Sequence, residues 1–396
     1  MMTQLQLFAC SLAPLLFISP AQGAVYKVNA KMSATEIQSK INRAVVGDTV
    51  DFAPGIYNLA SNGSNSNGAA LRLAAGVTYT GPRSGPPARL VGTGRYPLMY
   101  FSGRRVTIEH LVFDNGPLFL ENRVTNATID NNVFANIDCG SVASQTTAIF
   151  VAGGLNDSDI SYNSFQNIGQ TCNSQYQDKL GAGGIGLYGF HNLTITHNSF
   201  NTVYEGIGIS ISNSDEYDGS GGKINYNVFS GIHRMAIEIL GTNTNPSGLE
   251  VAYNHYSNAL LPWAYTFGFS LTAGQNMIVH DNVINANNNK PGYVPYAVEI
   301  AGNNTRAYNN VIEGYWEWGF AIGNATNMSI TNNYICGPAM AAHSPNQAAV
   351  SGNAKGFVSH ESSPRPGTVV SGNTTSASLT CAPPEPKPQN GVRTTK

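Results

Sequence analysis

The stretch INYNVFSGIHRMAIEIL (Ile224–Leu240) contains the two patterns that decide the fold of this chain. In the first, INYNVF, Asn227 is followed by one residue and then by the bulky apolar Phe229. In the second, AIEI, two isoleucines flank Glu238 as in a strand with one buried face. Because both patterns recur along the chain, they indicate a repeat architecture.

The asparagine pattern returns at intervals of 23 to 35 residues. Its asparagines are Asn132, Asn163, Asn198, Asn227, Asn254, Asn282, Asn310 and Asn333, and degenerate copies contain Leu111 and Asn373. Asparagine tolerates the left-handed conformation of a sharp turn, and its amide can bond to an equivalent amide one repeat away. We therefore predict that these asparagines form a ladder of turns.

A second strand of the form small–apolar–x–apolar lies between successive asparagine turns. The copies begin at Ala148, Gly184, Gly206, Ala236, Gly268, Ala297 and Gly319. A coil of this length cannot bury its own apolar face, but coils stacked at ~4.8 Å share a continuous core. The repeat predicts an all-β chain folded as a parallel β-helix of roughly ten coils.

The two ends of the repeat carry different patterns. Residues Ser33–Gln38 begin with helix-capping side chains, and Ile37, Ile41 and Val45 follow at helical spacing. We expect this helix to cover the open first coil, whose edge would otherwise be exposed. Residues 382–396 are rich in proline and polar side chains, which predicts a disordered tail. Residues 24–381 are thus expected to form one domain.

The chain resembles the pectate-lyase-like superfamily of right-handed parallel β-helix proteins in the order of its elements. A capping helix is followed by VGDTVDFAPGIYNL (Val46–Leu59) and then by the asparagine-turn coils. The resemblance covers roughly residues 25–380 and assigns no subfamily, because the superfamily includes lyases, glycosidases, epimerases and adhesins. It implies a polysaccharide-binding groove on one parallel sheet. The small–apolar–x–apolar strands match that sheet, and the loops that enter them are expected to flank the groove.

Composition narrows the function classes. The chain has 396 residues, 11% of them charged, and a net charge of −2, which argues against a nucleic-acid partner. The apolar residues 1–23 end in small side chains and predict a signal peptide cleaved after Gly23. No later segment has the length and apolarity to span a membrane. We therefore expect a secreted or periplasmic monomer.

Four cysteines follow the predicted signal peptide, and an even number in an exported chain suggests two disulfides. Cys139 and Cys172 stand at similar places in adjacent coils, so we expect them to pair. Cys336 and Cys381 would then tie the last coils together. The spacing does not match a zinc site, and we expect no bound metal.

Alternation along the predicted groove strands places one side chain of each strand outward. The outward series is Phe150, Gly186, Gly208, Glu238, Ser270, Glu299 and Ala321. Glu238 and Glu299 stand two coils apart, about 9–10 Å between backbones. Such a carboxylate pair suits the acid and base of an inverting glycosidase. Arg234 has the same outward parity as Glu238, so we expect it to tune Glu238 or to hold a substrate carboxylate, while His233 is a candidate proton carrier.

Aromatic and charged side chains gather in the loops that enter these strands. Aromatic rings pack on sugar C–H faces, and polar groups bond sugar hydroxyls. We expect the substrate-binding residues to be Lys179, Tyr204, Glu205, Trp263, Tyr265, Tyr296, Trp316 and Trp318.

Three alternatives remain open from the sequence. A polysaccharide lyase or uronate epimerase would use His233, Arg234, Lys179 or Tyr204, and it could bind Ca²⁺ through Glu238 and Glu299. A non-enzymatic adhesin would use the same groove for binding alone. In a third interpretation, both glutamates are solvated side chains on the strand face. The glycosidase itself requires no cofactor.

Overall fold

The computed structural model describes residues 23–381 except 60–67, 95, 140–145, 171, 173–182, 212–218, 242–247, 258–266, 287–293, 315, 324, 338–349, 352–366, 377 and 379. The backbone but not the side chain is described for Val294, Pro295, Glu317, Trp318, Val350 and Ser351. Apart from Gly23, the expected signal peptide and the expected C-terminal tail lie outside the described residues. Within the described part of the chain, no helix has the length and apolarity needed to cross a bilayer.

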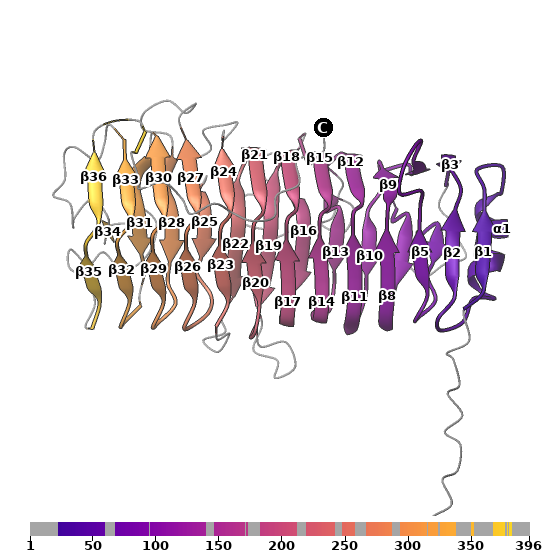
Figure 1. Ribbon diagram of the computed structural model, residues 1–396, viewed down its shortest axis with the longest axis horizontal. Coiled ribbons are helices and arrows are strands. Elements are labelled where there is room, and N and C mark those ends of the chain that lie inside the picture. Colours follow the sequence, from indigo (N-terminus) through magenta and orange to yellow (C-terminus); the bar gives the residue numbers. More distant parts are fainter. Residues whose placement is uncertain are drawn as a thin grey trace, which may run out of the picture.

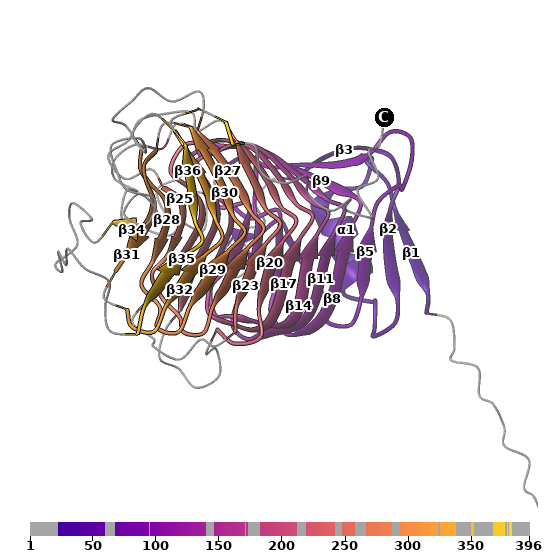
Figure 2. The ribbon, with the colours of Figure 1, turned by 60° about the vertical axis from the view of Figure 1, so that its left-hand side comes forward.

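Three long parallel sheets run along the molecule and enclose one elongated core (Figures 1 and 2). Sheet A has 13 described strands, sheet B has 12 and sheet C has 11. In each sheet, neighbouring strands come from successive coils and pair in parallel, for example β19 with β22 and β22 with β25. The predicted parallel β-helix is confirmed.

The strands of each sheet follow in chain order. Sheet A contains β1 (Val25–Val28), β2 (Thr49–Phe52), β5 (Thr78–Thr80), β8 (Arg104–Glu109), β11 (Val124–Asp130), β14 (Leu155–Ser161), β17 (Phe190–Thr196), β20 (Lys223–Asn225), β23 (Glu250–Ala252), β26 (Ile278–His280), β29 (Arg306–Tyr308), β32 (Ser329–Thr331) and β35 (Val369–Ser371). Sheet B contains β3 (Gly55–Asn58), β6 (Ala88–Val91), β9 (Leu111–Asp114), β12 (Val133–Ile137), β15 (Ser164–Ile168), β18 (Ser199–Val203), β21 (Val228–Ile232), β24 (His255–Ser257), β27 (Val283–Ala286), β30 (Val311–Gly314), β33 (Tyr334–Cys336) and β36 (Thr374–Ser376). Sheet C contains β4 (Leu71–Arg72), β7 (Met99–Phe101), β10 (Leu118–Leu120), β13 (Ile149–Val151), β16 (Gly183–Tyr188), β19 (Glu205–Ile211), β22 (Met235–Gly241), β25 (Phe267–Leu271), β28 (Val294–Ile300), β31 (Trp316–Ile322) and β34 (Val350–Ser351).

The bulky residue of each asparagine motif lies in the core. Phe113, Phe134, Phe165, Phe200 and Phe229 are fully buried, and their rings stack with centroids 4.6 to 5.2 Å apart. This spacing follows from the distance between stacked coils. Identical positions in successive coils therefore pack on one another, which is why a repeat in the sequence becomes a continuous core.

The asparagine ladder has the predicted hydrogen bonds. In each step the backbone N–H and the side-chain amide of one asparagine both donate to Oδ1 of the next, as Asn227 does to Asn254 at 3.0 Å. The same amide also donates to backbone carbonyls, such as that of Ile195 at 3.0 Å from Asn227. The chain of bonds runs without interruption from Asn132 to Asn373.

The left-handed conformation is not at the ladder asparagine itself, so that part of the prediction was wrong. The preceding residue has the positive φ, for example Tyr226 at 59° and Tyr253 at 57°. A left-handed residue other than glycine costs roughly 1–2 kcal/mol. The asparagine that follows is fully buried and its polar groups are bonded, so the ladder offsets this strain in every coil.

Replacing Asn227 with alanine should lower the free energy of unfolding by about 2–4 kcal/mol, because buried donors on Asn198 lose their acceptor. Chemical denaturation followed by circular dichroism measures this change. The matched control is Asn201→Ala on the exposed side of β18, which should stay within about 0.5 kcal/mol of wild type. Equal losses in the two variants would contradict a special role of the ladder.

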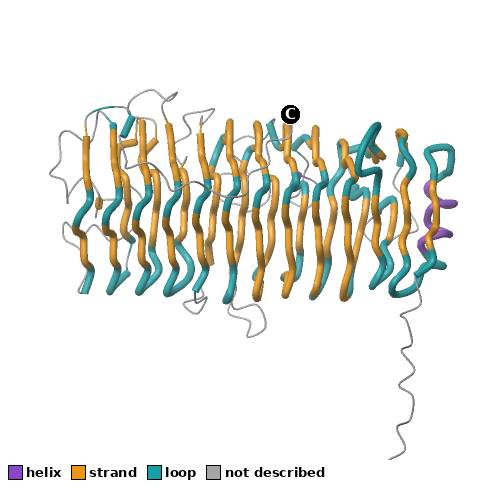
Figure 3. The backbone as a smooth tube through the Cα atoms, viewed as in Figure 1, coloured by secondary structure: helices purple, strands orange, loops and turns teal. Residues whose placement is uncertain are grey.

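Helix α1 (Ala34–Ile41) lies at one end of the row of strands (Figures 1 and 3). Ser33 and Glu36 form the expected capping box, and Ile37 and Ile41 are fully buried in the core. Gln38 bonds both backbone groups of Arg72 in β4, the first described strand of sheet C. Val45 is 65% exposed and lies beyond the end of the helix, contrary to our expectation.

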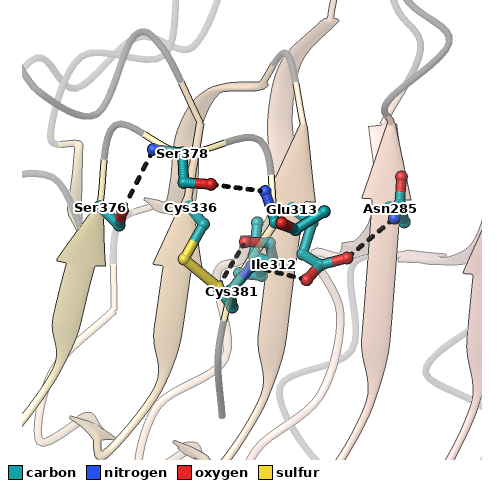
Figure 4. The surroundings of a disulfide bond; sticks show 8 residues. Asn285, Ile312, Glu313, Cys336, Ser376, Ser378 and Cys381 are labelled. Atoms are coloured by element: carbon teal, nitrogen blue, oxygen red, sulfur yellow. Dashed lines mark hydrogen bonds between the residues drawn. A yellow bond between two sulfur atoms is a disulfide. The ribbon is translucent and has the colours of Figure 1, made fainter.

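Both expected disulfides are present, Cys139–Cys172 and Cys336–Cys381, with Cα atoms 5.1 and 5.4 Å apart. Figure 4 shows that Cys381 reaches back over β30 and β33, where its backbone N–H donates to Glu313 at 2.8 Å. Glu313 in turn accepts from Asn285 in β27. The second disulfide thus fastens the end of the described chain to sheet B.

Candidate functional site

The outward residues predicted for the groove strands do share one register on sheet C. Strand pairing aligns Phe150, Gly186, Gly208, Glu238, Ser270, Glu299 and Ala321 in that order. We call these positions the carboxylate row. Ile237 and Ile239 beside Glu238 are fully buried in the core, so Glu238 points to the outer face of the sheet. One strand, β25, separates the two glutamates.

The glutamates face outward but are not solvated. Glu238 is 5% exposed and Glu299 is 3% exposed. The interpretation of both as solvated strand-face residues is therefore wrong.

An apolar cluster lies on the same face of sheet C. Met235, Phe267 and Tyr296 are paired in register, and they form a cluster with Ala321 of the carboxylate row. The rings of Phe267 and Tyr296 stack with centroids 5.4 Å apart. The carboxylates are thus held beside apolar side chains on a face with little exposure to water.

Arg234 connects the first glutamate to a third carboxyl group. Its guanidinium donates to both oxygens of Glu238, at 2.5 and 2.7 Å, and Nη1 also donates to Oε2 of Glu205 at 3.0 Å. All three side chains are almost fully buried. Arg234 precedes β22, and its backbone N–H donates to Tyr204 O, which fixes the arginine beside β19.

Of the two roles expected for Arg234, the geometry matches contact with Glu238. A bidentate pair with one carboxylate and a further bond to a second one engage the guanidinium inside the protein. This arrangement disagrees with the expectation that Arg234 holds a carboxylate of the substrate.

Burial raises the pKa of Glu205 well above its usual value, and the charge of Glu238 raises it further. The Arg234 guanidinium opposes this shift but does not cancel it. Glu205 Oε1 is buried and has no hydrogen-bond partner among the described residues. The trio thus consists of a buried ion pair between Arg234 and Glu238, and of Glu205, a second carboxyl group bonded to Arg234 whose pKa is raised.

Glu299 has a different environment from Glu238. Its Oε2 accepts a hydrogen bond from Ser270 Oγ at 2.6 Å. Burial raises the pKa of Glu299, the Ser270 hydrogen bond lowers it, and the charge of Glu238 raises it again. The two glutamates of the carboxylate row therefore differ, because Glu238 is ion-paired with Arg234 and the pKa of Glu299 is raised.

The Glu205→Gln variant should gain stability over wild type as pH rises. A raised folded-state pKa gives stability that is fully present below the unfolded pKa, near 4.5, and is lost as pH rises toward the folded value. Glutamine cannot ionise, so the free energy of unfolding of the variant should increasingly exceed that of wild type as pH rises above 4.5. Urea denaturation between pH 4 and pH 8 measures it.

Glu36→Gln is the control, and its stability relative to wild type should change with pH in the opposite direction. Hydrogen bonds from Ser33 lower the pKa of Glu36, so wild type should gain over this variant as pH rises from below 4.5. A pH-independent difference between Glu205→Gln and wild type would show that the pKa of Glu205 is the same in the folded and the unfolded protein.

The remaining predicted residues fall into three groups. Tyr204 is buried against the Cys139–Cys172 disulfide and stacks with His233 at 6.4 Å between ring centroids. Burial raises the pKa of Tyr204 and lowers that of His233. Tyr296 belongs to the apolar cluster, and the backbone of Trp318 pairs with it. Lys179, Trp263 and Tyr265 lie outside the described residues.

Trp316 is not placed as expected. Its side chain is fully buried in the main core, where it packs against Tyr256 with ring centroids 6.1 Å apart. Trp316 is the first residue of β31 rather than part of the preceding loop, and its side chain belongs to the core.

The sequence did not predict the bond of Arg234 to Glu205, although the repeat contained a signal for it. Aligning the coils places Tyr204 beside Arg234 and Glu205 beside Met235. Opposite charges one residue apart in adjacent coils stand within reach of each other. For metals, no three His, Cys, Asp or Glu side chains gather in the part of the chain that the structure describes.

Neither a protein-family model nor a curated protein matches the sequence. Solved structures match the fold. A surface adhesin of Streptococcus pneumoniae, PfbA, is 13% identical, with a TM-score of 0.55 over 89% of this chain and 90% of the adhesin. A lacto-N-biosidase from Eubacterium ramulus is 10% identical, with a TM-score of 0.54 over 89% and 68% of the two chains.

A tailspike protein of E. coli bacteriophage HK620, solved with a pentasaccharide, is 12% identical. Its TM-score is 0.50 over 90% of this chain and 65% of the tailspike chain. Identities this low establish the fold alone, which is the right-handed parallel β-helix.

Proposed function

We propose that this protein hydrolyses a polysaccharide on the outer face of sheet C, with Glu238 and Glu299 as the acid–base pair. The observation that carries the proposal is the carboxylate row. Two glutamates two strands apart, in different electrostatic environments, lie on one face beside buried apolar side chains. Two carboxyl groups whose environments push their pKa values apart are the usual acid and base of glycoside hydrolysis.

The environments assign a role to each glutamate. The raised pKa of Glu299 favours it as the acid that gives a proton to the leaving oxygen. Glu238 is ion-paired with Arg234 and acts as the carboxylate that activates water. The backbones of the two glutamates are two strand spacings apart, about 9–10 Å. Carboxyl groups that lie about 6.5–9.5 Å apart leave room for such a water and invert the anomeric carbon, which is the outcome that we propose. Tyr204 and His233 stack on each other next to Arg234, and the proposed acid–base pair needs neither of them to transfer a proton.

The matched structures support a carbohydrate ligand. One is a lacto-N-biosidase and another is a tailspike solved with a pentasaccharide. The disulfides support export from the cytoplasm, because structural disulfides persist in oxidising compartments. We therefore place the reaction outside the cell or in the periplasm.

A lyase or epimerase and a glycan-binding adhesin are the two alternatives. A lyase or epimerase must neutralise a uronate carboxylate, and Arg234 is engaged by two glutamates. Lys179, the other candidate cation, would then have to supply that charge. A glycan-binding adhesin is favoured by the match to PfbA, which covers nearly all of both chains. It would use the carboxylate row for hydrogen bonds alone.

One assay separates these functions. The secreted protein is incubated with a panel of neutral and acidic polysaccharides, and reducing ends and unsaturated sugars are measured together. We expect new reducing ends without ultraviolet absorbance from unsaturated products. Absorbance that rises with chain cleavage would identify a lyase, and retention of a polymer without cleavage would identify an adhesin.

A further inference from the structure

Ser270 stands between the two glutamates of the carboxylate row. Strand pairing places it beside Glu238 of β22 on one side and beside Glu299 of β28 on the other. The residue is 4% exposed, and its Oγ donates to Oε2 of Glu299 at 2.6 Å. Ser270 is the member of the row that bears a hydroxyl group, so it is placed to control a proton on Glu299.

This hydrogen bond makes the two oxygens of Glu299 different. A serine hydroxyl has a single proton to donate, and a protonated carboxyl group has one O–H and one oxygen that accepts. Because Oε2 accepts the proton of Ser270, the acid proton of Glu299 is left on Oε1. Both side chains are almost fully buried, and a hydrogen bond is stronger where water does not compete for it.

The same hydrogen bond strengthens when Glu299 gives up its proton. Burial raises the pKa of Glu299 and the Ser270 bond lowers it, while Glu238, the other titratable group of the row, raises it as well. Ala321 faces Glu299 from β31 and has no polar side chain. A bond to a carboxylate is roughly twice as strong as one to a neutral oxygen. An interaction that strengthens as the reaction proceeds lowers the barrier.

We infer that Ser270 is the positioning residue of the acid, because it keeps the acid proton on Oε1 of Glu299 and stabilises the carboxylate formed when that proton leaves; this inference rests on the proposed function. In the reaction the O–H bond at Oε1 breaks, and its proton goes to the glycosidic oxygen as that oxygen leaves the anomeric carbon. Water adds to the carbon and gives a proton to Glu238. Ser270 keeps its own proton throughout.

The first test follows the proton on Glu299 without any substrate. Glutamate carboxyl carbons are isotope-labelled, NMR spectra are recorded from pH 4 to pH 9, and Glu299→Gln identifies the signal of Glu299. We expect Glu299 to titrate at higher pH in Ser270→Ala than in wild type, because a bond that lowers its pKa is gone. An unchanged pKa would overturn the inference. A lower pKa would overturn it too, since Glu299 would then donate to Ser270.

The second test measures kinetics on the polysaccharide panel. Ser270→Ala should lower kcat by roughly 10–100-fold with little change in KM, which is the usual contribution of one hydrogen bond to a charged group. The alkaline limb of its pH profile should move to higher pH. Ser270→Thr keeps the hydroxyl and should restore the limb and most of kcat. A folded Ser270→Thr with the kcat of Ser270→Ala would overturn the role of the hydroxyl.

Ser210 offers the matched control. It lies on the same outer face of sheet C, two residues after Gly208, and it pairs with Leu240 of β22. Ser210→Ala should keep the wild-type kcat and pH profile. Circular dichroism checks that each variant is folded. An equal loss of kcat in Ser210→Ala and Ser270→Ala would overturn a specific role of Ser270.

The two tests also separate the role of Ser270 from the proposed function. If wild type cleaves no polysaccharide but Glu299 titrates at higher pH in Ser270→Ala, hydrolysis is disproved and the control of the Glu299 proton is supported. If polysaccharide is cleaved while the pKa of Glu299 is unchanged in Ser270→Ala, hydrolysis is supported and the role of Ser270 is overturned.

Discussion

Replacing Arg234 with methionine should lower the free energy of unfolding by about 3–5 kcal/mol, which is the usual cost of removing one partner from a buried ion pair. Methionine fills a similar volume but leaves the Glu238 carboxylate buried without its counter-ion. Glu238 must then either take up a proton or draw in water, and both cost stability. Denaturation in guanidinium chloride, followed by circular dichroism, measures the loss.

Two controls show whether the loss comes from the unpaired charge. Arg306→Met changes an exposed arginine on β29 and should be nearly neutral, because a surface charge contributes little. The triple variant Glu205→Gln, Arg234→Met, Glu238→Gln removes every charge of the trio and should recover most of the stability. If the triple variant is as unstable as Arg234→Met, packing of the arginine side chain is the cause.

Glu299→Gln and Glu238→Gln should each lower kcat for polysaccharide hydrolysis by roughly 10²–10⁴-fold, the usual contribution of one acid or base. Glutamine keeps the shape of each side chain but can neither donate the proton of Glu299 nor accept one at Glu238. KM should change much less, because the amide still offers an oxygen to sugar hydroxyls. Initial rates of reducing-end release across a pH series give both constants.

The control for these variants is Glu109→Gln on β8, a strand of sheet A, which should retain wild-type kcat. The pH profile adds a second test. Glu299→Gln should lose the alkaline limb of the wild-type profile, because that limb reports deprotonation of the acid. If Glu238→Gln or Glu299→Gln keeps full activity, the acid–base pair has been wrongly assigned.

The repeat made most of the fold predictable from the sequence. One asparagine per coil predicted the ladder from Asn132 to Asn373, and one small–apolar–x–apolar strand per coil predicted sheet C. The same period aligned Glu238 with Ser270 and Glu299. The predicted position of the left-handed residue was wrong, because Tyr226 and its equivalents have the positive φ. The motif shows which residues form the turn but not which one takes the left-handed conformation.

The candidate site was only partly predictable. Its two glutamates followed from register, but the bond between Arg234 and Glu205 joins side chains of adjacent coils that differ from the repeat consensus. The sequence assigned Trp316 to the groove because it precedes a strand, whereas the structure places it beside Tyr256 in the core. A residue type that appears in only one coil has no counterparts in other coils, so the repeat does not predict whether its side chain points into the core or outward.

The sequence by itself therefore determined the parallel β-helix, both disulfide pairings and the row that contains Glu238 and Glu299. These depend on periodicity, since equivalent positions of stacked coils must lie side by side. Only the tertiary structure decided that both glutamates are buried, that Arg234 bonds Glu205 as well as Glu238, and that burial raises the pKa of Glu299. Burial and ion pairing depend on distances between side chains of different coils and on access to water, and neither quantity is encoded in the period of a repeat.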